Sequence, residues 1–420
     1  MSFLERRAGE LALDGVSLEE VARRFGTPCY VYSRAAIESA FREFDEGLAA
    51  IDHLVCYAVK ANSNLAILDV LRRLGAGFDI VSGGELARVR AAGGAAERIL
   101  FSGVGKSEAE IRAALGERIR CFNVESEPEL ERLDALAGAL GTVAAVSLRV
   151  NPDVDAKTHP YISTGLAGNK FGIPYGRALD VYRRAARLPH LRVSGIDCHI
   201  GSQILEISPL DAAVDRVLEL AGALRGSGIA LEHVDFGGGF GIRYRDEQAI
   251  DVRAYAATLA RRLAGSGLQV LLEPGRYIVG NAGVLLTRVE YLKLDKAKRF
   301  AVVDASMSEL IRPALYAAWH DIVPVSSLGR RERATYDVVG PVCESADVLG
   351  TARELAVGEG DLLAILSTGA YAMAMASNYN SRPRPPEVLV DGARAFEIRA
   401  RESVASLFAG ERTLDRAMEP

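Results

Sequence analysis

The feature of this sequence that most limits its fold is a regular alternation of short apolar, β-branched runs with longer amphipathic segments. Eight such runs occupy residues 54–59, 77–81, 99–102, 120–124, 144–150, 193–199, 231–236 and 269–272. The segments between them place apolar residues at three- and four-residue steps, as helices do, at residues 84–92, 107–115, 127–140, 178–187, 209–224 and 252–263. Eight strand-then-helix units predict an α/β fold with a TIM-like (β/α)8 barrel, whose active site forms at the C-terminal ends of the strands. The pattern leaves a doubly wound open sheet as the alternative.

After about residue 280 the sequence pattern changes to strand-like runs separated by turn residues. These runs are residues 283–289, 300–304, 334–339, 362–366 and 387–390. Another run, at residues 29–32, precedes the first barrel helix, and we expect it to pair with the later strands. Since 420 residues exceed what one compact core usually takes, the sequence predicts two domains. They are a barrel over residues 36–279 and a mostly β domain formed by residues 1–35 and 280–420.

Charge and cysteine content narrow the class of protein. The net charge of −5 is small for this length, and no run of like charge stands out, so neither nucleic acid nor a membrane surface is an expected partner. No stretch approaches the apolar length of a membrane span, and the N-terminus does not resemble a secretory signal. The five cysteines are scattered and never in C-x-x-C spacing, so we expect a reduced, cytoplasmic enzyme and no metal site. They are Cys29, Cys56, Cys121, Cys198 and Cys343.

Lys60 stands out because it ends an apolar strand, whereas the other lysines occupy polar stretches. The chain has seven lysines against forty-three arginines. An ammonium in a low-dielectric setting loses hydration, which favours the neutral amine, a nucleophile toward an aldehyde. The alternative is a lysine that reaches from the strand end into solvent.

Three other strand ends carry residues suited to a phosphorylated cofactor. Three glycines, at residues 237–239, follow one strand, where backbone N–H groups can approach a phosphate, although such a triplet also suits a tight turn. The sequence EPGR at 273–276 offers a carboxylate and a guanidinium, and HIGSQ at 199–203 offers an imidazole and a hydroxyl. An amine, a glycine loop, a carboxylate and a ring at the strand ends of one barrel indicate pyridoxal 5'-phosphate.

At this point the chain resembles a known family, the barrel-type pyridoxal-phosphate amino-acid decarboxylases, and within it the branch that acts on diaminopimelate. The resemblance runs essentially from end to end and implies a fold of the alanine-racemase-like type, fold type III of the pyridoxal-phosphate enzymes. The motifs that carry it are YAVKAN (57–62), GFDIVSGGE (77–85), HIGSQ (199–203), DFGGG (235–239), EPGR (273–276), RPALY (312–316), GPVCES (340–345), GAY (369–371) and SNYN (377–380).

The resemblance implies roles for individual residues. Lys60 would bind the aldehyde of the cofactor, His199 would stack on its ring, and Glu273 would pair with the ring nitrogen. Ser202, Gly239 and Arg276 would lie at the phosphate, and the remaining residues beside the cofactor would be Asp79, Gly238, Gly275 and Tyr371.

A second group of residues is implied to bind the substrate. Its remote carboxylate would meet Arg276, Arg312 and Tyr316, its remote amine would meet Glu344, and Tyr371 would contact both substrate and cofactor. Cys343 and Glu344 would enter from the second subunit of a homodimer with shared active sites, and Cys343 would donate a proton to the decarboxylated carbon. The residues alone leave two alternatives open. Arg312 would form an ion pair with Glu309 or Asp304, or Cys343 would be a small core residue.

The implied reaction is decarboxylation of meso-2,6-diaminopimelate to L-lysine and CO2, the last step of lysine biosynthesis. A carboxylate at Glu273 favours a protonated ring nitrogen and hence decarboxylation, whereas a racemase of similar fold commonly has an arginine there. Ornithine or lysine would leave Arg312 without a carboxylate. The alternatives are a decarboxylase of another dibasic amino acid, a racemase, or a cofactor carrier of the single-barrel type, which would need no second domain.

Overall fold

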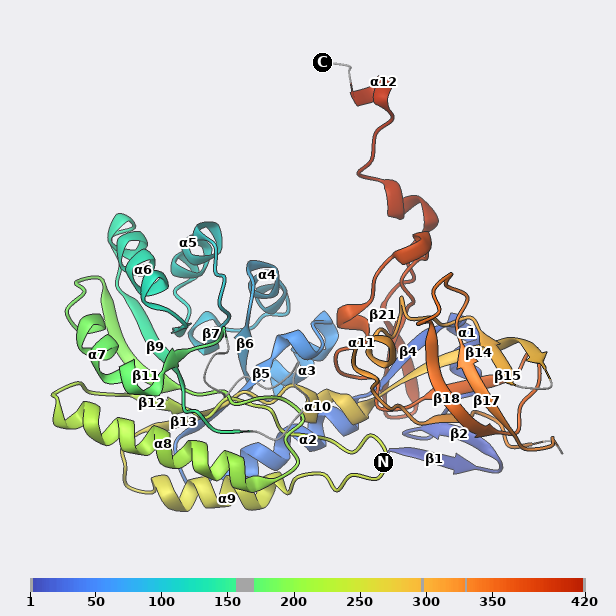
Figure 1. Ribbon diagram of the computed structural model, residues 1–420, viewed down its shortest axis with the longest axis horizontal. Coiled ribbons are helices and arrows are strands. Elements are labelled where there is room, and N and C mark those ends of the chain that lie inside the picture. The colour runs from blue at the N-terminus through green and yellow to red at the C-terminus, as the bar shows by residue number, and fades with distance from the viewer. Residues whose placement is uncertain (1–2, 156–169, 296–297, 329–330, 418–420) are drawn as a thin grey trace. The chain divides into compact units, whose positions relative to one another are not determined.

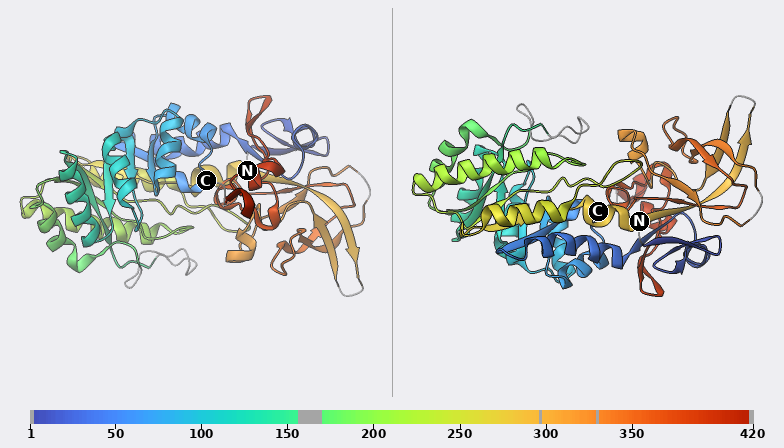
Figure 2. Two further views of the ribbon diagram at one scale, coloured as in Figure 1. Left: turned by 90° about the horizontal axis from the view of Figure 1, so that it is seen from above. Right: turned by 90° about the horizontal axis from the view of Figure 1, so that it is seen from below.

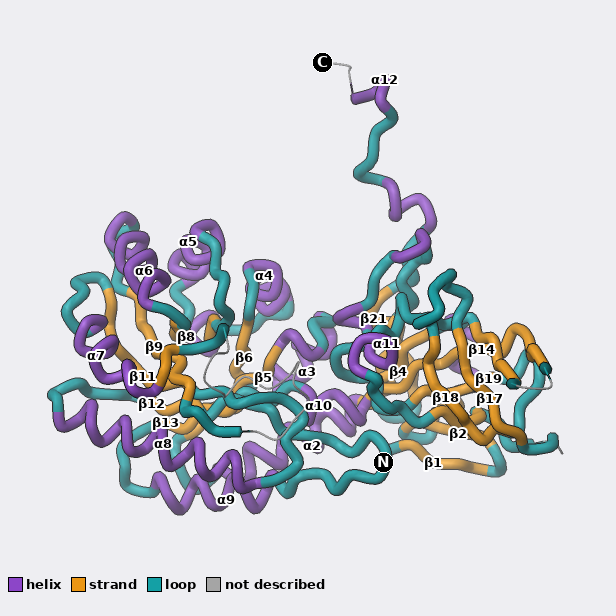
Figure 3. Tube along the Cα trace, viewed as in Figure 1, coloured by secondary structure: helices purple, strands orange, loops and turns teal. Residues whose placement is uncertain are grey.

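The computed structural model describes residues 3–155, 170–295, 298–328 and 331–417. It divides into two compact units, one of residues 37–279 and one that combines residues 1–36 with 280–420. Each unit has its own arrangement of strands, which are drawn in orange in Figure 3, and each unit is described by itself below.

The unit of residues 37–279 is built on eight parallel strands that close into a barrel. Neighbouring strands pair in the order β9, β11, β12, β13, β5, β6, β7 and β8, and pairing of β8 with β9 completes the ring, which excludes the open sheet. The strands are β5 (His53–Ala58), β6 (Gly77–Ile80), β7 (Ile99–Phe101), β8 (Cys121–Val124), β9 (Ala144–Asn151), β11 (Leu191–Asp197), β12 (His233–Asp235) and β13 (Gln269–Leu272), with a two-residue strand β10 (Ile173–Pro174) beside β9.

The longer barrel helices lie on the outside of the strands, as Figures 1 and 2 show, and the short α10 follows the end of β13. They are α2 (Arg34–Leu48), α3 (Leu65–Arg73), α4 (Gly83–Ala91), α5 (Glu108–Glu117), α6 (Glu127–Ala139), α7 (Tyr175–Ala185), α8 (Ile207–Gly226), α9 (Val252–Leu263) and α10 (Arg276–Val279). The expected barrel is therefore confirmed, with most boundaries within one or two residues of the expected ones.

Three successive helices begin with the same local device. Ser82, Ser107 and Ser126 precede α4, α5 and α6, and each hydroxyl accepts a hydrogen bond from the backbone N–H three residues later. In each case that later residue is a glutamate, and at α5 its side chain returns a bond to the serine to complete a capping box. Such caps stabilise a helix by about 1 kcal/mol. They fix the loops at the C-terminal ends of the strands, where the site lies.

The barrel interior changes from apolar to polar along its axis. One layer is apolar and contains Leu54, Cys56, Leu100, Cys121 and Leu271. Toward the C-terminal ends of the strands the buried side chains become polar, at Asp79, Asn123, Asp197 and Asp235. Burying so many polar groups costs stability, so this end of the barrel is shaped by function more than by packing.

The other unit is mostly β-structure. Its main sheet runs β18, β17, β15, β14, β4, β20 and β21, and β4 pairs with β14 and β20, as expected for the early run at residues 29–32. The elements are β4 (Cys29–Ser33), β14 (Gly283–Leu294), β15 (Arg299–Val303), β16 (Ile322–Pro324), β17 (Ala334–Val339), β18 (Val348–Leu355), β19 (Leu362–Ile365), β20 (Glu387–Asp391), β21 (Arg394–Arg399), α11 (Arg312–Tyr316) and α12 (Leu414–Ala417).

Several parts of this unit do not follow from the sequence pattern, the short strand β16 and strand β21 among them. A three-stranded sheet of β1 (Leu4–Arg7), β2 (Glu10–Leu13) and β3 (Val16–Ser17), followed by α1 (Leu18–Phe25), was not expected, because its strands are too short to show alternation. Strand β18 was also not expected, since glycine and charged residues interrupt its apolar pattern, and it forms by pairing with β17. Among the described residues, no helix is long and apolar enough to cross a membrane.

Candidate active site

Lys60 lies in a single 3-10 turn (Val59–Ala61) directly after β5. Its Nζ is 2.7 Å from Oδ2 of Asp79, and the Asp79 side chain, on neighbouring β6, is fully buried. The Lys60 side chain is itself 34% exposed. Lys60 therefore lies between the two alternatives, a buried amine and one that reaches into solvent: a buried carboxylate holds its amine while part of the side chain stays exposed.

Lys106 shows why burial alone does not identify the reactive lysine. Its side chain is 1% exposed, more buried than Lys60 despite its polar sequence context. The Lys106 ammonium donates to the carbonyls of Gly103 and Asn123 and to Glu129, so its three hydrogens all have acceptors. Lys106 is a structural lysine, whereas the amine of Lys60 contacts the buried Asp79 and its side chain is partly exposed.

The glycines at 237–239 allow three strand-end loops to pack backbone against backbone. A Cβ on Gly238 would stand 2.1 Å from the carbonyl oxygen of Glu273, and one on Gly239 would stand 2.3 Å from that of Gly201. Gly239 also has a φ of +92°, a conformation that favours glycine. Any side chain at these positions would push apart the loops after β11, β12 and β13.

Arg276 begins α10 inside this set of loops and is almost fully buried. Its guanidinium donates to the hydroxyl of Tyr244 at 2.6 Å and to that of Ser202 at 2.9 Å. Gly275, just before it, lies against Ala58 and Ala61, where a Cβ would be 3.0–3.1 Å from theirs. The guanidinium of Arg276, the hydroxyl of Ser202 and glycine-rich backbone therefore lie together at the C-terminal ends of these strands.

His199 lies in the loop two residues after β11, not inside the strand as its sequence run suggested. Its Nδ1 accepts a hydrogen bond from the N–H of Gly238 at 3.2 Å. Loss of solvation, together with the positive charges of Arg149 and Lys60, lowers the pKa of His199 well below its usual value. The imidazole is therefore neutral and carries its proton on Nε2.

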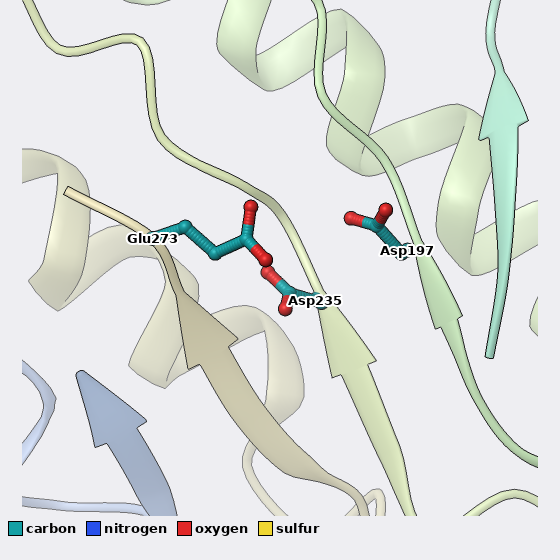
Figure 4. A group of neighbouring side chains, drawn as sticks. All are labelled: Asp197, Asp235 and Glu273. Carbon is teal, nitrogen blue, oxygen red and sulfur yellow. The ribbon is translucent and has the colours of Figure 1, made fainter. Parts of the chain in front are cut away.

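Three buried carboxyl groups meet at the ends of neighbouring strands, as Figure 4 shows. Oxygens of Asp197 on β11, Asp235 on β12 and Glu273 after β13 lie within 4.8 Å of one another. Glu273 hydrogen-bonds the carboxyl of Asp235 and accepts a bond from Asn123 at 3.3 Å. Burial and mutual repulsion raise the pKa of all three, that of Asp235 to about 7. Because such groups cannot all ionise together, at least one proton is shared among them.

The β-rich unit holds the residues expected to bind substrate. Arg312 begins α11 and is buried, and its Nη1 lies 3.4 Å from Nε2 of His320. Of the two carboxylates named as alternative partners of Arg312, Asp304 accepts from Thr287 and Glu309 from Ser306. Tyr316 ends the same helix.

Three further residues of this unit lie on loops. Cys343 is exposed whereas the other four cysteines are buried, which argues against a core role. Its neighbour Glu344 is also exposed and accepts a hydrogen bond from the hydroxyl of Tyr379 at 2.6 Å. Tyr371 has a φ of +55°, uncommon for a bulky residue and typical of positions held for function.

Sequence reasoning missed several residues that contact the expected site residues or lie beside them at the strand ends. Asp197 and Asp235 end barrel strands beside motifs that were noticed, and their positions at strand ends were the available clue. The others are buried partners whose roles depend on tertiary contacts: Asn123, Arg149, Tyr244 and His320.

Comparison with known proteins defines the class of the barrel. A family described as "Pyridoxal-dependent decarboxylase, pyridoxal binding domain" matches residues 34–280, more than half of the chain. The residues present fit that cofactor, because a partly exposed lysine, a guanidinium beside glycine backbone and a buried carboxyl cluster suit its aldehyde, phosphate and ring nitrogen. The chain is thus a pyridoxal-phosphate-dependent decarboxylase by class.

Relatives along the whole chain make the assignment more specific. The chain is 58% identical to the diaminopimelate decarboxylase of Pseudomonas fluorescens over 415 residues, which cover 99% of this chain and 100% of the relative. The same enzyme of Vibrio cholerae is 55% identical, covering 98% of this chain and 99% of the relative. This protein belongs to the diaminopimelate decarboxylase family.

Solved structures agree. Diaminopimelate decarboxylase from Helicobacter pylori, complexed with L-lysine, matches with a TM-score of 0.89 and 43% identity over 94% of this chain and 98% of that one. The enzyme from M. jannaschii, also in complex with L-lysine, matches with a TM-score of 0.92 and 38% identity over 98% of each chain.

Proposed function

We propose that this protein removes the carboxylate at one end of meso-2,6-diaminopimelate, giving L-lysine and CO2 as the last step of lysine biosynthesis. The observation that carries the proposal is the buried carboxyl cluster around Glu273, because a carboxyl group facing a pyridine nitrogen can give that nitrogen its proton and then stabilise the resulting charge. Bound pyridoxal phosphate then withdraws the electrons left on the substrate carbon. The relatives' activity and their structures with L-lysine support the same substrate.

Within the barrel, the residues divide the work of holding the cofactor. Lys60 is the amine that binds the aldehyde, and Asp79 holds that amine in place through its 2.7 Å contact. Neutral His199 provides a flat, uncharged ring to stack on the pyridine, and Glu273 faces the ring nitrogen. The phosphate lies against Gly238 and Gly239, with Ser202 and Arg276 as the side-chain donors and Gly275 as the close neighbour of Arg276.

Substrate selection belongs to the β-rich unit. Arg312 offers a buried guanidinium to the remote carboxylate, with Tyr316 from the same helix, Arg276 and Tyr371 as further contacts. Glu344 offers a carboxylate to the remote amine. A substrate with both charges at its far end satisfies both groups, whereas ornithine or lysine would leave a buried guanidinium without its anion.

We further propose a homodimer in which Cys343 and Glu344 of one subunit complete the site built on Lys60 of the other. The exposure of Cys343 and Glu344 supports this arrangement, since neither is committed to its own core. Cys343 donates the proton that replaces CO2 on the substrate carbon. The four other cysteines, free and buried, suit a reducing compartment, and we place the enzyme in the cytoplasm.

The test is a product assay with the purified full-length protein and pyridoxal phosphate. Incubation with meso-diaminopimelate should release CO2 and L-lysine in equal amounts, and Lys60→Ala should abolish both. Isomerised diaminopimelate without CO2 would instead indicate a racemase. Faster release of CO2 from ornithine or lysine would indicate a decarboxylase of another dibasic amino acid.

A further inference from the structure

Asp197 is the member of the carboxyl cluster that the proposed function leaves without a role. It is the last residue of β11, and strand pairing places it between Arg149 of β9 and Asp235 of β12. The residue is 1% exposed. A carboxyl group so deeply buried needs either a cation, hydrogen-bond donors or a proton.

The neighbouring cation, Arg149, attracts the Asp197 carboxyl group but forms its ion pair with another residue. Arg149 forms its ion pair with Glu125 at 2.8 Å, and its guanidinium lies 4.9 Å from the centre of the Phe171 ring. No donor among the described residues reaches Oδ1 of Asp197, and Oδ2 of Asp235 likewise receives no hydrogen bond from a described donor. Protonation of Asp197 removes the unpaired charge and supplies a donor where one is missing.

We propose that Asp197 is a positioning residue that stays protonated and thereby keeps the negative charge of the carboxyl cluster on Glu273. The inference rests on the proposed placement of the cofactor ring at Glu273.

The connection from Asp197 to Glu273 runs through Asp235. The cluster oxygens lie within 4.8 Å of one another, a gap that one bridging water spans, and Asp235 is hydrogen-bonded to Glu273. Were Asp197 ionised, its charge would favour a proton on Glu273, which would then no longer attract the ring proton. The charged or titratable groups that face Asp197 from the surrounding strands are Asp235, Glu273, Arg149, Glu125 and Asp79.

Two variants separate this role from simple packing. Asp197→Asn keeps a neutral donor of the same size, and Asp197→Ala removes the donor. With cofactor labelled isotopically at its ring nitrogen, magnetic resonance reports whether that nitrogen is protonated. The wild type and Asp197→Asn should both show a protonated nitrogen and kcat values within about twofold. Asp197→Ala is equally uncharged, so the ring nitrogen should stay protonated in that variant too, and any loss of kcat should come from the lost packing.

Infrared spectroscopy provides a second measurement that needs no turnover. At neutral pH the carbonyl band of a protonated carboxyl group should be present in the wild-type holoenzyme and reduced in Asp197→Asn. An unchanged band, or a ring nitrogen that loses its proton in Asp197→Asn or Asp197→Ala, would overturn the inference. If Asp197→Ala does not fold, Asp197→Asn and the infrared band still decide. Failure of the wild type to decarboxylate diaminopimelate would count against the proposed function and leave the infrared result standing.

Discussion

The guanidinium of Arg312 and the imidazole of His320 form a buried pair in which the histidine accepts the hydrogen bond. Nε2 of His320 lies 3.4 Å from Nη1 of Arg312, while Nδ1 lies 2.8 Å from the carbonyl oxygen of Leu366. Because a carbonyl can only accept, Nδ1 carries the proton and Nε2 is free to accept from the arginine. The side chain proposed to select substrate is thus held by a neutral ring with a fixed tautomer.

His320→Ala should weaken substrate binding more than turnover, because it frees Arg312 without touching the reacting atoms. Loss of one hydrogen bond to a charged group is worth about 1.5 kcal/mol, or roughly tenfold in KM. Steady-state kinetics with diaminopimelate measure the change. His320→Gln, whose amide oxygen can accept from Arg312, is the matched control and should recover most of the loss; equal defects in the two variants would contradict the positioning role.

Arg312→Ala should reduce kcat/KM for diaminopimelate by about 30-fold, the equivalent of about 2 kcal/mol for a charge-assisted hydrogen bond. The absorbance of bound cofactor should be unchanged, because Arg312 is proposed to touch only the far end of the substrate. Arg312→Lys keeps the positive charge without the planar fork of donors, so its kcat/KM should lie between those of the wild type and Arg312→Ala. Wild-type kinetics in Arg312→Ala would refute the substrate clamp.

Reduction of the holoenzyme with borohydride should fix the pyridoxyl group on Lys60. The reason is that the Lys60 side chain is partly exposed at the end of β5, beside Asp79, whereas the Lys106 side chain is buried and its ammonium donates to three acceptors. Peptide mapping by mass spectrometry locates the label, and Lys60→Ala should carry none. Label on Lys106 or Lys170 would show the assignment to be wrong.

Subunit mixing tests the shared active site. Lys60→Ala and Cys343→Ala should each be nearly inactive, and after exchange about half of the dimers are hybrids with one intact site, giving about a quarter of wild-type activity. Lys60→Ala mixed with Glu273→Ala is the control, since both changes lie in the barrel and no site is restored. Verified exchange without recovery would mean that Lys60 and Cys343 act within one chain or that Cys343 is not catalytic.

Stability should depend on pH through Glu85, the glutamate at the third position of α4. Burial raises the pKa of Glu85 from its ordinary 4.5 to about 7. The folded state therefore binds more protons than the unfolded state between these values, so stability falls as pH rises through that window. The Tm of Glu85→Gln should fall less than that of the wild type from pH 5 to pH 8.

Glu110, at the same position of α5, is the matched control for this experiment. Hydrogen bonds from the N–H groups of Gly83 and Ser107 lower the pKa of Glu110. Its carboxylate therefore stabilises the folded state at pH values above its ordinary pKa, and this stabilisation is lost as pH falls. Glu110→Gln should therefore change the acid side of the stability curve and leave the window near pH 7 as in the wild type. Identical curves for Glu85→Gln and the wild type would show that Glu85 does not titrate there.

The sequence by itself determined the eight strand-then-helix units, because apolar runs separated by amphipathic helices bury both faces of a parallel sheet, whereas the pairing of β8 with β9 decided that the sheet closes into a barrel. It also determined which segments reach the site, since parallel strands deliver their C-terminal ends to one rim. Lys60, His199 and Glu273 were found this way, each just after a strand.

Only the tertiary structure decided how those groups are paired and charged. Asp79 binds Lys60 across neighbouring strands, His320 accepts from Arg312, and Asp197 joins the carboxyl cluster through strand register. Burial and charge state depend on neighbours far away in the chain: Lys106 looks exposed in sequence and is buried, while Lys60 looks buried and is partly exposed. A hydrophobic pattern specifies which face of a strand turns inward, but the stability of a buried charge depends on the particular atoms brought within a few ångströms of it.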